Sequence, residues 1–456
     1  MDSIENLGGE DRGRRASIRK VALASSIGAT IEWYDFFLYG TAAGLVFNQL
    51  FFPSDNPTAG TLAAYATFAA GFVARPVGGV IFGHFGDRIG RKTMLVITLL
   101  LMGIATFAIG LLPTYEQVGL WAPALLLALR ILQGIGLGGE WGGAVLMAVE
   151  HAPEGRRGFF GSWPQVGVPA GLLLGTGMFT LLSVWLSEDQ FLSWGWRAAF
   201  LSSAILVAVG MYIRLQILES PAFTEIKEAQ DEAQVPIVEL LRTQPKESIL
   251  SVGSRFAEGV SFNVFGVFVI SYLTSQLGLP ITTALLGVSI AAAISCVLTP
   301  VYGALSDRVG RRPVFALGAV AYGLFALPSF LLLNTRQTVW IVVALVVAFG
   351  LIHPAMEGIL SSFWAELFDT RVRYSGVSFA YQFSGIFASG LTPLIATALL
   401  AAGGGQPWFL GAYMMGAALI TVISIFALQE THKKDIFTTR LPASSREPEP
   451  ATVERG

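Results

Sequence analysis

Long apolar stretches alternate with short polar segments along nearly the whole chain. Each stretch holds about 20 residues or more, the length at which an α-helix crosses the hydrocarbon core of a bilayer. These stretches fall near 21–46, 60–83, 93–113, 121–149, 158–186, 196–215, 247–276, 282–305, 313–333, 338–362, 375–401 and 407–428. The pattern therefore predicts an all-α membrane protein with twelve transmembrane helices.

The composition agrees with a membrane protein and excludes several other classes. Of the 456 residues, 53% are hydrophobic and 13% are charged, whereas a soluble domain carries about 25% charged residues. The single cysteine, Cys296, excludes a disulfide framework, and the four histidines are scattered, so we expect no metal site and no cofactor. A net charge of −2 without a basic stripe argues against nucleic acid as a partner.

The two halves of the chain repeat each other. A loop of the form G-x-x-x-D-R-x-G-R-[KR] follows the second stretch and recurs after the eighth. Six spans followed by six, with matching loops, indicate two six-helix pseudo-repeats related by an axis along the membrane normal. The expected divisions are an N-terminal tail at 1–20, a first half at 21–215, a linker at 216–246, a second half at 247–428 and a C-terminal tail at 429–456.

The distribution of lysine and arginine predicts the orientation in the membrane. If both tails and the loops after spans 2, 4, 6, 8 and 10 share one side, that side holds 24 of the 29 basic residues. The other side holds only Arg197 and Arg336. Positive charge concentrates on the cytoplasmic side of membrane proteins. We therefore expect both termini to be cytoplasmic.

Acidic side chains inside the predicted spans are candidates for proton coupling. A charge inside a span costs at least about 2.5–3.5 kcal/mol, so each one needs a partner or a wet cavity. Glu32 and Asp35 are three residues apart, hence on one face of the first span. Carboxylates this close disfavour joint ionisation, which suits a proton carrier. The candidates are Asp35, Glu32, Glu140, Glu258 and Glu357, with Asp35 preferred.

Three arginines inside the spans favour an anionic solute over a neutral one, because guanidinium groups recognise carboxylates. Pairing of these arginines with the nearby acids is an open alternative: Arg75 with Glu32 or Asp35, and Arg255 with Glu258. A structural hydrogen-bonding role is likewise open for His353. The candidate substrate-binding residues are Arg75, Arg130, Arg255, Tyr34, Gln133 and His353.

The fourth span contains a glycine-rich run in which Gly134, Gly136 and Gly139 match G-x-G-x-x-G. No strand precedes the run, which lies inside a long hydrophobic stretch, so dinucleotide binding is not indicated. Gly134 and Gly138 form a small-xxx-small pair, a pattern typical of close helix packing in membranes.

Several segments carry a family resemblance. The repeated loop resembles the signature of the major facilitator superfamily. A larger set of segments resembles the metabolite:proton symporters of that superfamily, and most of all the shikimate-type permeases among them. The set comprises residues 32–36, 74–79, 83–88, 133–144 and 194–197.

The resemblance implies a secondary carrier that imports a small organic acid, such as shikimate, a dicarboxylate or an aromatic acid, together with a proton. Its two halves would rock around a midplane site in alternating access. It implies a monomeric transporter rather than an enzyme, located in a bacterial inner membrane. The expected partners are the organic anion, protons and the lipid bilayer.

The resemblance also implies an inner gate built on the repeated loop, whose salt bridges break when the carrier opens inward. We expect Asp87 to join Arg91, Glu150 and Arg156 in a charge network there. Carried over by position, the gate residues are Gly83, Asp87, Arg88, Gly90, Arg91, Glu150, Arg156, Asp307, Arg308 and Arg311.

The sequence is also compatible with transported solutes other than an organic acid. A proline or betaine zwitterion fits if internal acids cancel the arginines, although the proline-containing tail at 429–456 has no heptads for an osmosensing coiled coil. A sugar is disfavoured where Ala222 replaces the basic residue that sugar porters usually carry. A drug exporter would favour cationic or apolar solutes.

Overall fold

A computed structural model describes residues 22–23, 25–89, 91–138, 141–216 and 236–434. The side chains of residues 83–93, 95, 213–216 and 236–237 lie outside this description. Within the described ranges the chain is helical with short connections, and it contains no strand. Residues 217–235 of the 216–246 linker lie outside the described residues, and the described part contains helix α14 (Pro236–Thr243) and the start of α15 at Pro245.

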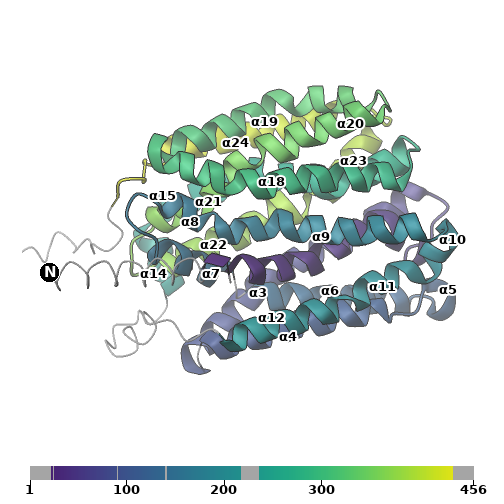
Figure 1. The fold of residues 1–456 in the computed structure, drawn as a ribbon, viewed down its shortest axis with the longest axis horizontal. Coiled ribbons are helices and arrows are strands. Elements are labelled where there is room, and N and C mark those ends of the chain that lie inside the picture. The colour runs from purple at the N-terminus through teal and green to yellow at the C-terminus, as the bar shows by residue number, and fades with distance from the viewer. Residues whose placement is uncertain (1–21, 24, 90, 139–140, 217–235, 435–456) are drawn as a thin grey trace, which may run out of the picture.

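Six helical segments make up the first half of the chain (Figure 1). The first covers residues 25–42, η1 (Ala43–Phe47) and α2 (Asn48–Leu50). The others are α3 (Pro57–Ile89), α4 (Arg91–Gly110), α6 with α7 (Trp121–Leu137, Trp141–Glu150), α8 with α9 (Arg157–Gly161, Trp163–Trp185), and α10, η2, α11 and α12 in succession (Glu188–Gln190, Phe191–Gly195, Trp196–Leu201, Ser203–Gln216). Helix α5 (Tyr115–Val118) lies in a loop.

Six further segments follow in the second half. The first runs through α15 (Pro245–Ser254), α16 (Phe256–Asn263), η3 (Val264–Phe268), α17 (Val269–Ser271) and η4 (Tyr272–Gln276). The others are α18 (Ile281–Val309), α19 (Arg311–Leu333), α20 with η5 and α21 (Thr338–Leu345, Val346–Ile352, Pro354–Leu367), α22 with η6 and α23 (Arg373–Ser384, Gly385–Gly390, Thr392–Ala402), and α24 (Trp408–Ala427). The predicted all-α, twelve-helix fold is confirmed.

Length and composition make most of these segments capable of crossing a membrane. Ten of them qualify among the described residues, and the apolar part of α4 over Val96–Gly110 is a shorter eleventh. The first segment carries Glu32 and Asp35 in its middle, both buried. Its burial inside the bundle separates these charges from lipid.

Glycine contacts hold α3 against α6. A Cβ at Gly78 would meet the carbonyl oxygen of Ile135, and one at Gly138 would meet that of Arg75. Gly134 likewise lies against the backbone of Gly71. The predicted small-residue packing of Gly134 and Gly138 is confirmed, and it brings the arginine-bearing faces of α3 and α6 together.

The two halves meet along the full length of the bundle, chiefly where α18 packs beside α9 (Figure 1). In mid-bundle the hydroxyls of Thr176 and Ser289 are 2.9 Å apart. At the end that carries α14 and the start of α8, which we call the termini end, Asp307 accepts the backbone N–H of Gly158. At the opposite end Tyr65 donates to Ser271. Contacts between the halves thus occur at both ends of the bundle among the described residues.

Candidate functional site

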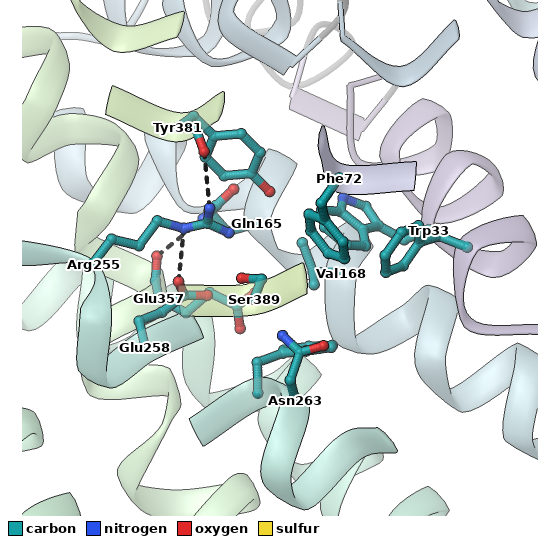
Figure 2. A pocket seen from close by; sticks show the side chains of 12 residues that line it. Trp33, Phe72, Gln165, Val168, Arg255, Glu258, Asn263, Glu357, Tyr381 and Ser389 are labelled. Atoms are coloured by element: carbon teal, nitrogen blue, oxygen red, sulfur yellow. Dashed lines mark hydrogen bonds and ion pairs between the residues drawn. The ribbon is translucent and has the colours of Figure 1, made fainter. Parts of the chain in front are cut away.

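A small cavity lies in the middle of the bundle between the two halves (Figure 2). Its free volume is about 10 Å³, which is room for about one water molecule. Both halves supply its walls, and most of its polar groups come from the second half. The lining residues are Trp33, Phe36, Phe72, Gln165, Val168, Arg255, Glu258, Phe262, Asn263, Glu357, Tyr381 and Ser389.

Arg255 is the basic residue of the cavity wall. It lies at the junction of α15 and α16, where the backbone leaves regular helix, and is almost fully buried. Its Nε donates to Glu258 at 2.8 Å and its Nη1 to the carbonyl oxygen of Tyr381 at 3.1 Å. The guanidinium also stacks on the Tyr381 ring, 3.9 Å from the centroid. The open alternative of an Arg255–Glu258 ion pair is what the structure shows.

His353 and Glu357 form the second polar pair of this half. The π-helix η5 ends just before His353, whose N–H bonds to the carbonyl of Ala348, and the wider turn sets the position of the imidazole. Its Nε2 lies 3.2 Å from the Glu357 carboxylate. Neither ring nitrogen and neither carboxylate oxygen has a hydrogen bond of good geometry among the described residues.

Glu258, His353 and Glu357 place one donor atom each within 4.8 Å of one another. Three such donors satisfy the spacing of a metal site. However, Arg255 already occupies one oxygen of Glu258 at 2.8 Å. A divalent ion at this position would face that buried guanidinium, so the charge arrangement disfavours it.

In the first half, Arg75 and Arg130 lie in an aromatic cage. The Arg75 guanidinium is 4.3 Å from the Phe72 centroid and 4.7 Å from that of Phe36. Arg130 lies 4.3 Å from both Phe36 and Tyr39. Each such contact is worth about 2 kcal/mol when it is desolvated, which offsets part of the cost of burying the charge.

Both caged arginines keep unused N–H groups. The Nε and Nη2 of Arg75 and those of Arg130 lack hydrogen-bond partners among the described residues. Arg130 donates from Nη1 to Gln133, which in turn donates to Thr106 at 2.7 Å. Gln133 is thus a positioning residue for Arg130 and lies behind the cavity wall.

The two acids of the first span occupy different surroundings. Glu32 is within electrostatic range of Arg75, as the pairing alternative anticipated. Asp35 is fully buried, and neither carboxylate oxygen has a hydrogen bond of good geometry among the described residues. Neither acid lines the cavity. Glu140 lies outside the described residues.

Tyr34 points away from the cavity. Its hydroxyl donates to the carbonyl of Ala199 and lies 2.9 Å from the Ser202 hydroxyl, so it connects the first span to α11 and to the residue that follows α11. The structure therefore gives this substrate-binding candidate a contact within the first half only.

Gln165, Asn263 and Tyr381 are among the cavity residues that the sequence did not mark as candidates. The Trp141 indole donates to Gln165, and the Trp141 ring stacks on Tyr381 across the two halves, with centroids 3.6 Å apart. The Oδ1 of Asn263 has no hydrogen-bond partner among the described residues. Neutral polar and aromatic residues are common in spans, so only their spacing relative to Arg255 and Glu258 could have marked them.

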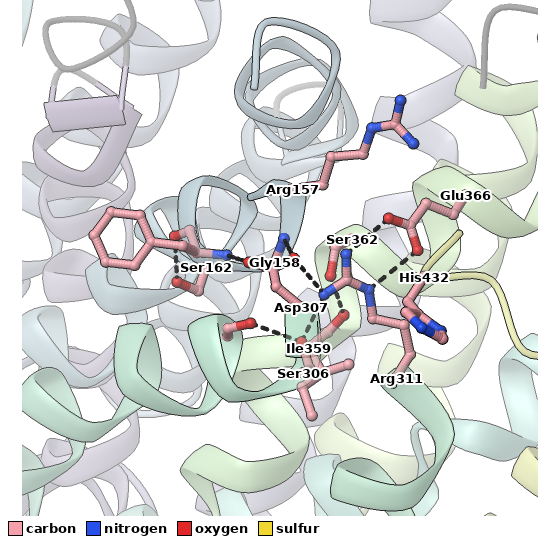
Figure 3. A network of polar contacts seen from close by, with 12 residues as sticks. Arg157, Gly158, Ser162, Ser306, Asp307, Arg311, Ile359, Ser362, Glu366 and His432 are labelled. Atoms are coloured by element: carbon pink, nitrogen blue, oxygen red, sulfur yellow. Dashed lines mark hydrogen bonds and ion pairs between the residues drawn. The ribbon is translucent and has the colours of Figure 1, made fainter. Parts of the chain in front are cut away.

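A polar network closes the termini end (Figure 3). Arg311 binds Glu366 through Nε and Nη2, at 3.1 and 2.8 Å, and Asp307 through Nη1 at 2.8 Å. Asp307 also accepts the backbone N–H groups of Gly158 and Phe159 at the start of α8. Of the expected gate residues, Asp307 thus connects the two halves and Arg311 binds Asp307 from its own half, whereas Arg308 is exposed. Glu366 was not among the gate residues expected from the sequence.

The expected first-half gate is described only in part. The side chains of Gly83, Asp87, Arg88 and Arg91, and all of Gly90, lie outside the described residues, so the network predicted around Asp87 remains a prediction. Glu150 contacts Arg373 of the second half at 3.2 Å. Arg156, expected in the same network, is exposed. Its neighbour Arg157 is the buried arginine, and it donates to the carbonyl of Lys434.

The segment after α24 is hydrogen-bonded to the polar network at the termini end. Thr431 donates to Glu366 at 2.8 Å, and Glu430 accepts the backbone N–H groups of Arg311 and Arg312, the first residues of α19. Partial burial alone would raise the pKa of Glu430. The backbone N–H groups of Arg311, Arg312, Thr431 and His432 donate to its carboxylate, and these bonds lower the pKa below its usual value.

Sequence comparisons match most of the chain to known membrane proteins. The profile of the Major Facilitator Superfamily matches residues 25–388 and also 252–450. The shikimate transporter of Escherichia coli K12 is 40% identical over 417 residues, which cover 91% of this chain and 95% of that protein. The inner membrane metabolite transport protein YhjE of the same strain is 41% identical, covering 92% and 96%. Its proline/betaine transporter is 35% identical, covering 92% and 85%.

Solved structures agree on the fold. The proton:xylose symporter XylE, bound to 6-bromo-6-deoxy-D-glucose, superposes with a TM-score of 0.72. The match covers 93% of this chain and 98% of that one at 18% sequence identity. At that identity the likeness concerns the arrangement of helices alone.

Proposed function

Because the chain belongs to the Major Facilitator Superfamily and is thus a multi-pass membrane transporter, we propose that it is a proton-coupled symporter of a small organic acid. The proposal has three parts: the charge of the solute, the coupling to protons, and movement by alternating access. Its solute class includes shikimate, dicarboxylates and aromatic acids.

The buried arginines carry the argument for an organic acid. Arg255 lines the cavity, and Arg75 lies directly behind the rings of Phe36 and Phe72 that line it from the other half. Both arginines act electrostatically on the same residue, Tyr381. A carboxylate is the ligand that a planar guanidinium binds with two parallel hydrogen bonds. A solute carboxylate near Tyr381 would therefore draw the two halves together.

The small volume of the cavity supports alternating access. Its free volume of about 10 Å³ admits no organic acid, so solute enters only when the contacts at one end separate. The bonds from the Gly158 and Phe159 N–H groups to Asp307 at one end, and the Tyr65–Ser271 contact at the other, are the candidates for separation.

The relatives support the solute class. The names of two of them specify shikimate and an unspecified metabolite as the transported molecule. A zwitterion such as proline or betaine is the second candidate, because Glu258 and Glu357 could hold its cationic group beside Arg255. The proline/betaine relative supports this alternative.

Transport in proteoliposomes tests the proposal. An acid-outside gradient should drive accumulation of at least one member of a panel of shikimate, dicarboxylates and aromatic acids, and a protonophore should abolish it. Accumulation of proline or betaine alone would favour the zwitterion. Uptake of no acid under the gradient would reject the proposal.

We further propose a bacterial inner-membrane location with both termini cytoplasmic and function as a monomer, since one chain supplies the whole cavity wall. A cysteine at Arg242, in α14 at the termini end, should escape impermeant reagent in sealed right-side-out vesicles on a Cys296→Ala background. A cysteine at Asp189 in α10 should react. The reverse pattern would invert the orientation.

A further inference from the structure

Four buried side chains of the second half form one electrostatic unit, which we call the second-half cluster: Arg255, Glu258, His353 and Glu357. We propose that the coupling proton binds this cluster, on the Glu357–His353 pair, and not the acids of the first span. The inference deepens the proposed symport and rests on it.

The Glu357–His353 pair of this cluster is shielded from water, and its polar side-chain atoms lack well-formed hydrogen bonds among the described residues. Glu357 and His353 are fully buried. The imidazole lies between Phe349, stacked at 4.8 Å, and Phe262 at 5.5 Å. Its only ion-pair contact among the described residues is Glu357 at 3.2 Å. Both Glu357 oxygens lack a well-formed hydrogen bond. An ionised carboxylate in this position would forfeit its hydration without replacement.

The second-half cluster carries one negative charge that no positive charge within it compensates. With a neutral imidazole, Arg255 contributes one positive charge and the two glutamates contribute two negative charges. Arg255 is committed to Glu258 at 2.8 Å. The remaining charge belongs to Glu357, and one added positive charge neutralises the cluster. In the first half, Glu32 already lies within electrostatic range of Arg75.

The groups around the pair favour a proton as that charge. The titratable and charged groups that face it are Arg255 and Glu258 on the segment of α16, Tyr381 on α22 and Cys296 on α18. Gln165 of α9 adds an amide that donates to the Glu357 backbone carbonyl. A sodium ion needs several oxygen ligands, whereas the cavity holds about one water. A proton needs only one lone pair, which Glu357 or His353 supplies.

The contact between Glu258 and Arg255 connects this proton to the solute. A solute carboxylate that binds Arg255 competes with Glu258 for its N–H groups. Glu258 is then less compensated, the cluster becomes more negative, and it binds a proton more tightly. Thermodynamic linkage requires the reverse as well: a proton on the cluster must raise solute affinity by the same factor.

Infrared spectroscopy tests the site without any solute. The purified wild-type protein should show the carbonyl band of a protonated carboxylic acid that disappears as pH rises. Glu357→Gln should remove the band, and His353→Gln should shift its titration. Glu116→Gln, an exposed control in α5, should leave it unchanged. A band that survives Glu357→Gln and disappears in Asp35→Asn would overturn the assignment.

Transport supplies the second test, with shikimate as the probe and any acid that the panel identifies as a replacement. In the wild type, solute affinity should fall about tenfold or more from acid to alkaline pH. In Glu357→Gln it should be high and independent of pH, with exchange retained and gradient-driven accumulation lost. Glu357→Asp should restore some accumulation, which separates loss of the proton from misfolding.

The two proposals fail differently. If the wild type accumulates no acid but keeps the titrating band, the solute assignment fails and the proton site stands. If it accumulates acid and Glu357→Gln accumulates it equally well, the proton site fails alone. Accumulation that follows a sodium gradient instead of pH would overturn the choice of a proton.

Discussion

At the residue scale, buried arginines do two different jobs in this molecule. Arg75 and Arg130 are stabilised by aromatic faces and keep free N–H groups, whereas Arg255 is held by Glu258 and by the carbonyl of Tyr381. Of these three, Arg255 is the one whose planar fork reaches a carboxylate and a carbonyl at once. Its replacement by lysine should therefore be informative.

We expect Arg255→Lys to weaken solute binding about tenfold, equivalent to about 1.4 kcal/mol, because an ammonium group loses bidentate recognition. The charge is kept, so Glu258 stays compensated and the protein should still fold. Equilibrium binding of the transported acid measures the change. Arg336→Lys, in an exposed loop at the opposite end, is the matched control; equal affinities in the two variants would contradict the role of Arg255.

The hydrogen bonds of Glu430 should make the stability of the folded protein depend on pH in the acid range. Its pKa is lowered in the folded protein, so its stabilising effect is complete above the unfolded value of about 4.3 and is lost as pH falls through the lower folded value. The thermal midpoint of Glu430→Gln should lie below that of the wild type at neutral pH, and the difference should vanish in acid. A difference that persists unchanged in acid would show that the contact does not depend on the charge.

At the element scale, the spans could be predicted because bilayer thickness fixes how many apolar residues each helix needs. The positions at which these helices depart from regular α-helix could not be predicted. The π-helical turns η3, η5 and η6 bring Asn263, His353 and Ser389 to the site, yet a shift of one hydrogen bond leaves hydropathy unchanged. The charged site residues were recognisable because charge in a span is costly, whereas Gln165 and Tyr381 bear none.

Close packing of α3 on α6 predicts a strong effect of small substitutions. Gly78→Ala would push a methyl group into the carbonyl of Ile135, and overpacking of this kind costs about 1–3 kcal/mol. We expect a lower thermal midpoint and reduced yield of folded protein. Gly416→Ala in α24 meets nothing within 4 Å and should be neutral. Equal stability of the two variants would show that α3 and α6 can move apart freely.

At the scale of the whole molecule, the termini end is closed by contacts that cross between the halves. Asp307 is central, since it accepts from Gly158 and Phe159 of the first half and from Arg311 of the second. The repeated loop allowed Asp307 and Arg311 to be expected as gate residues. Their connection to Glu366 and Thr431 depends on three-dimensional proximity of distant segments, which no local pattern encodes.

Asp307→Asn should open this end more often, because an amide is uncharged and a weaker partner for both Arg311 and the two N–H groups. Ser362, buried against Gly161, reports on the opening. In a Cys296→Ala background, a cysteine at Ser362 should react with a maleimide several-fold faster in the variant. Asp189→Asn at the other end is the control; an unchanged rate would argue against Asp307 as a gate.

The stacked pair of Trp141 and Tyr381 has an optical consequence. One ring belongs to each half, they overlap at 3.6 Å and 13° in the closed form, and the indole N–H is bonded to Gln165. Separation of the halves would hydrate this indole and shift its emission to longer wavelength. Trp185 and Trp408 face outward already and would give a constant background. The chain thus contains an intrinsic fluorophore through which each opening can be followed in real time, without any attached dye.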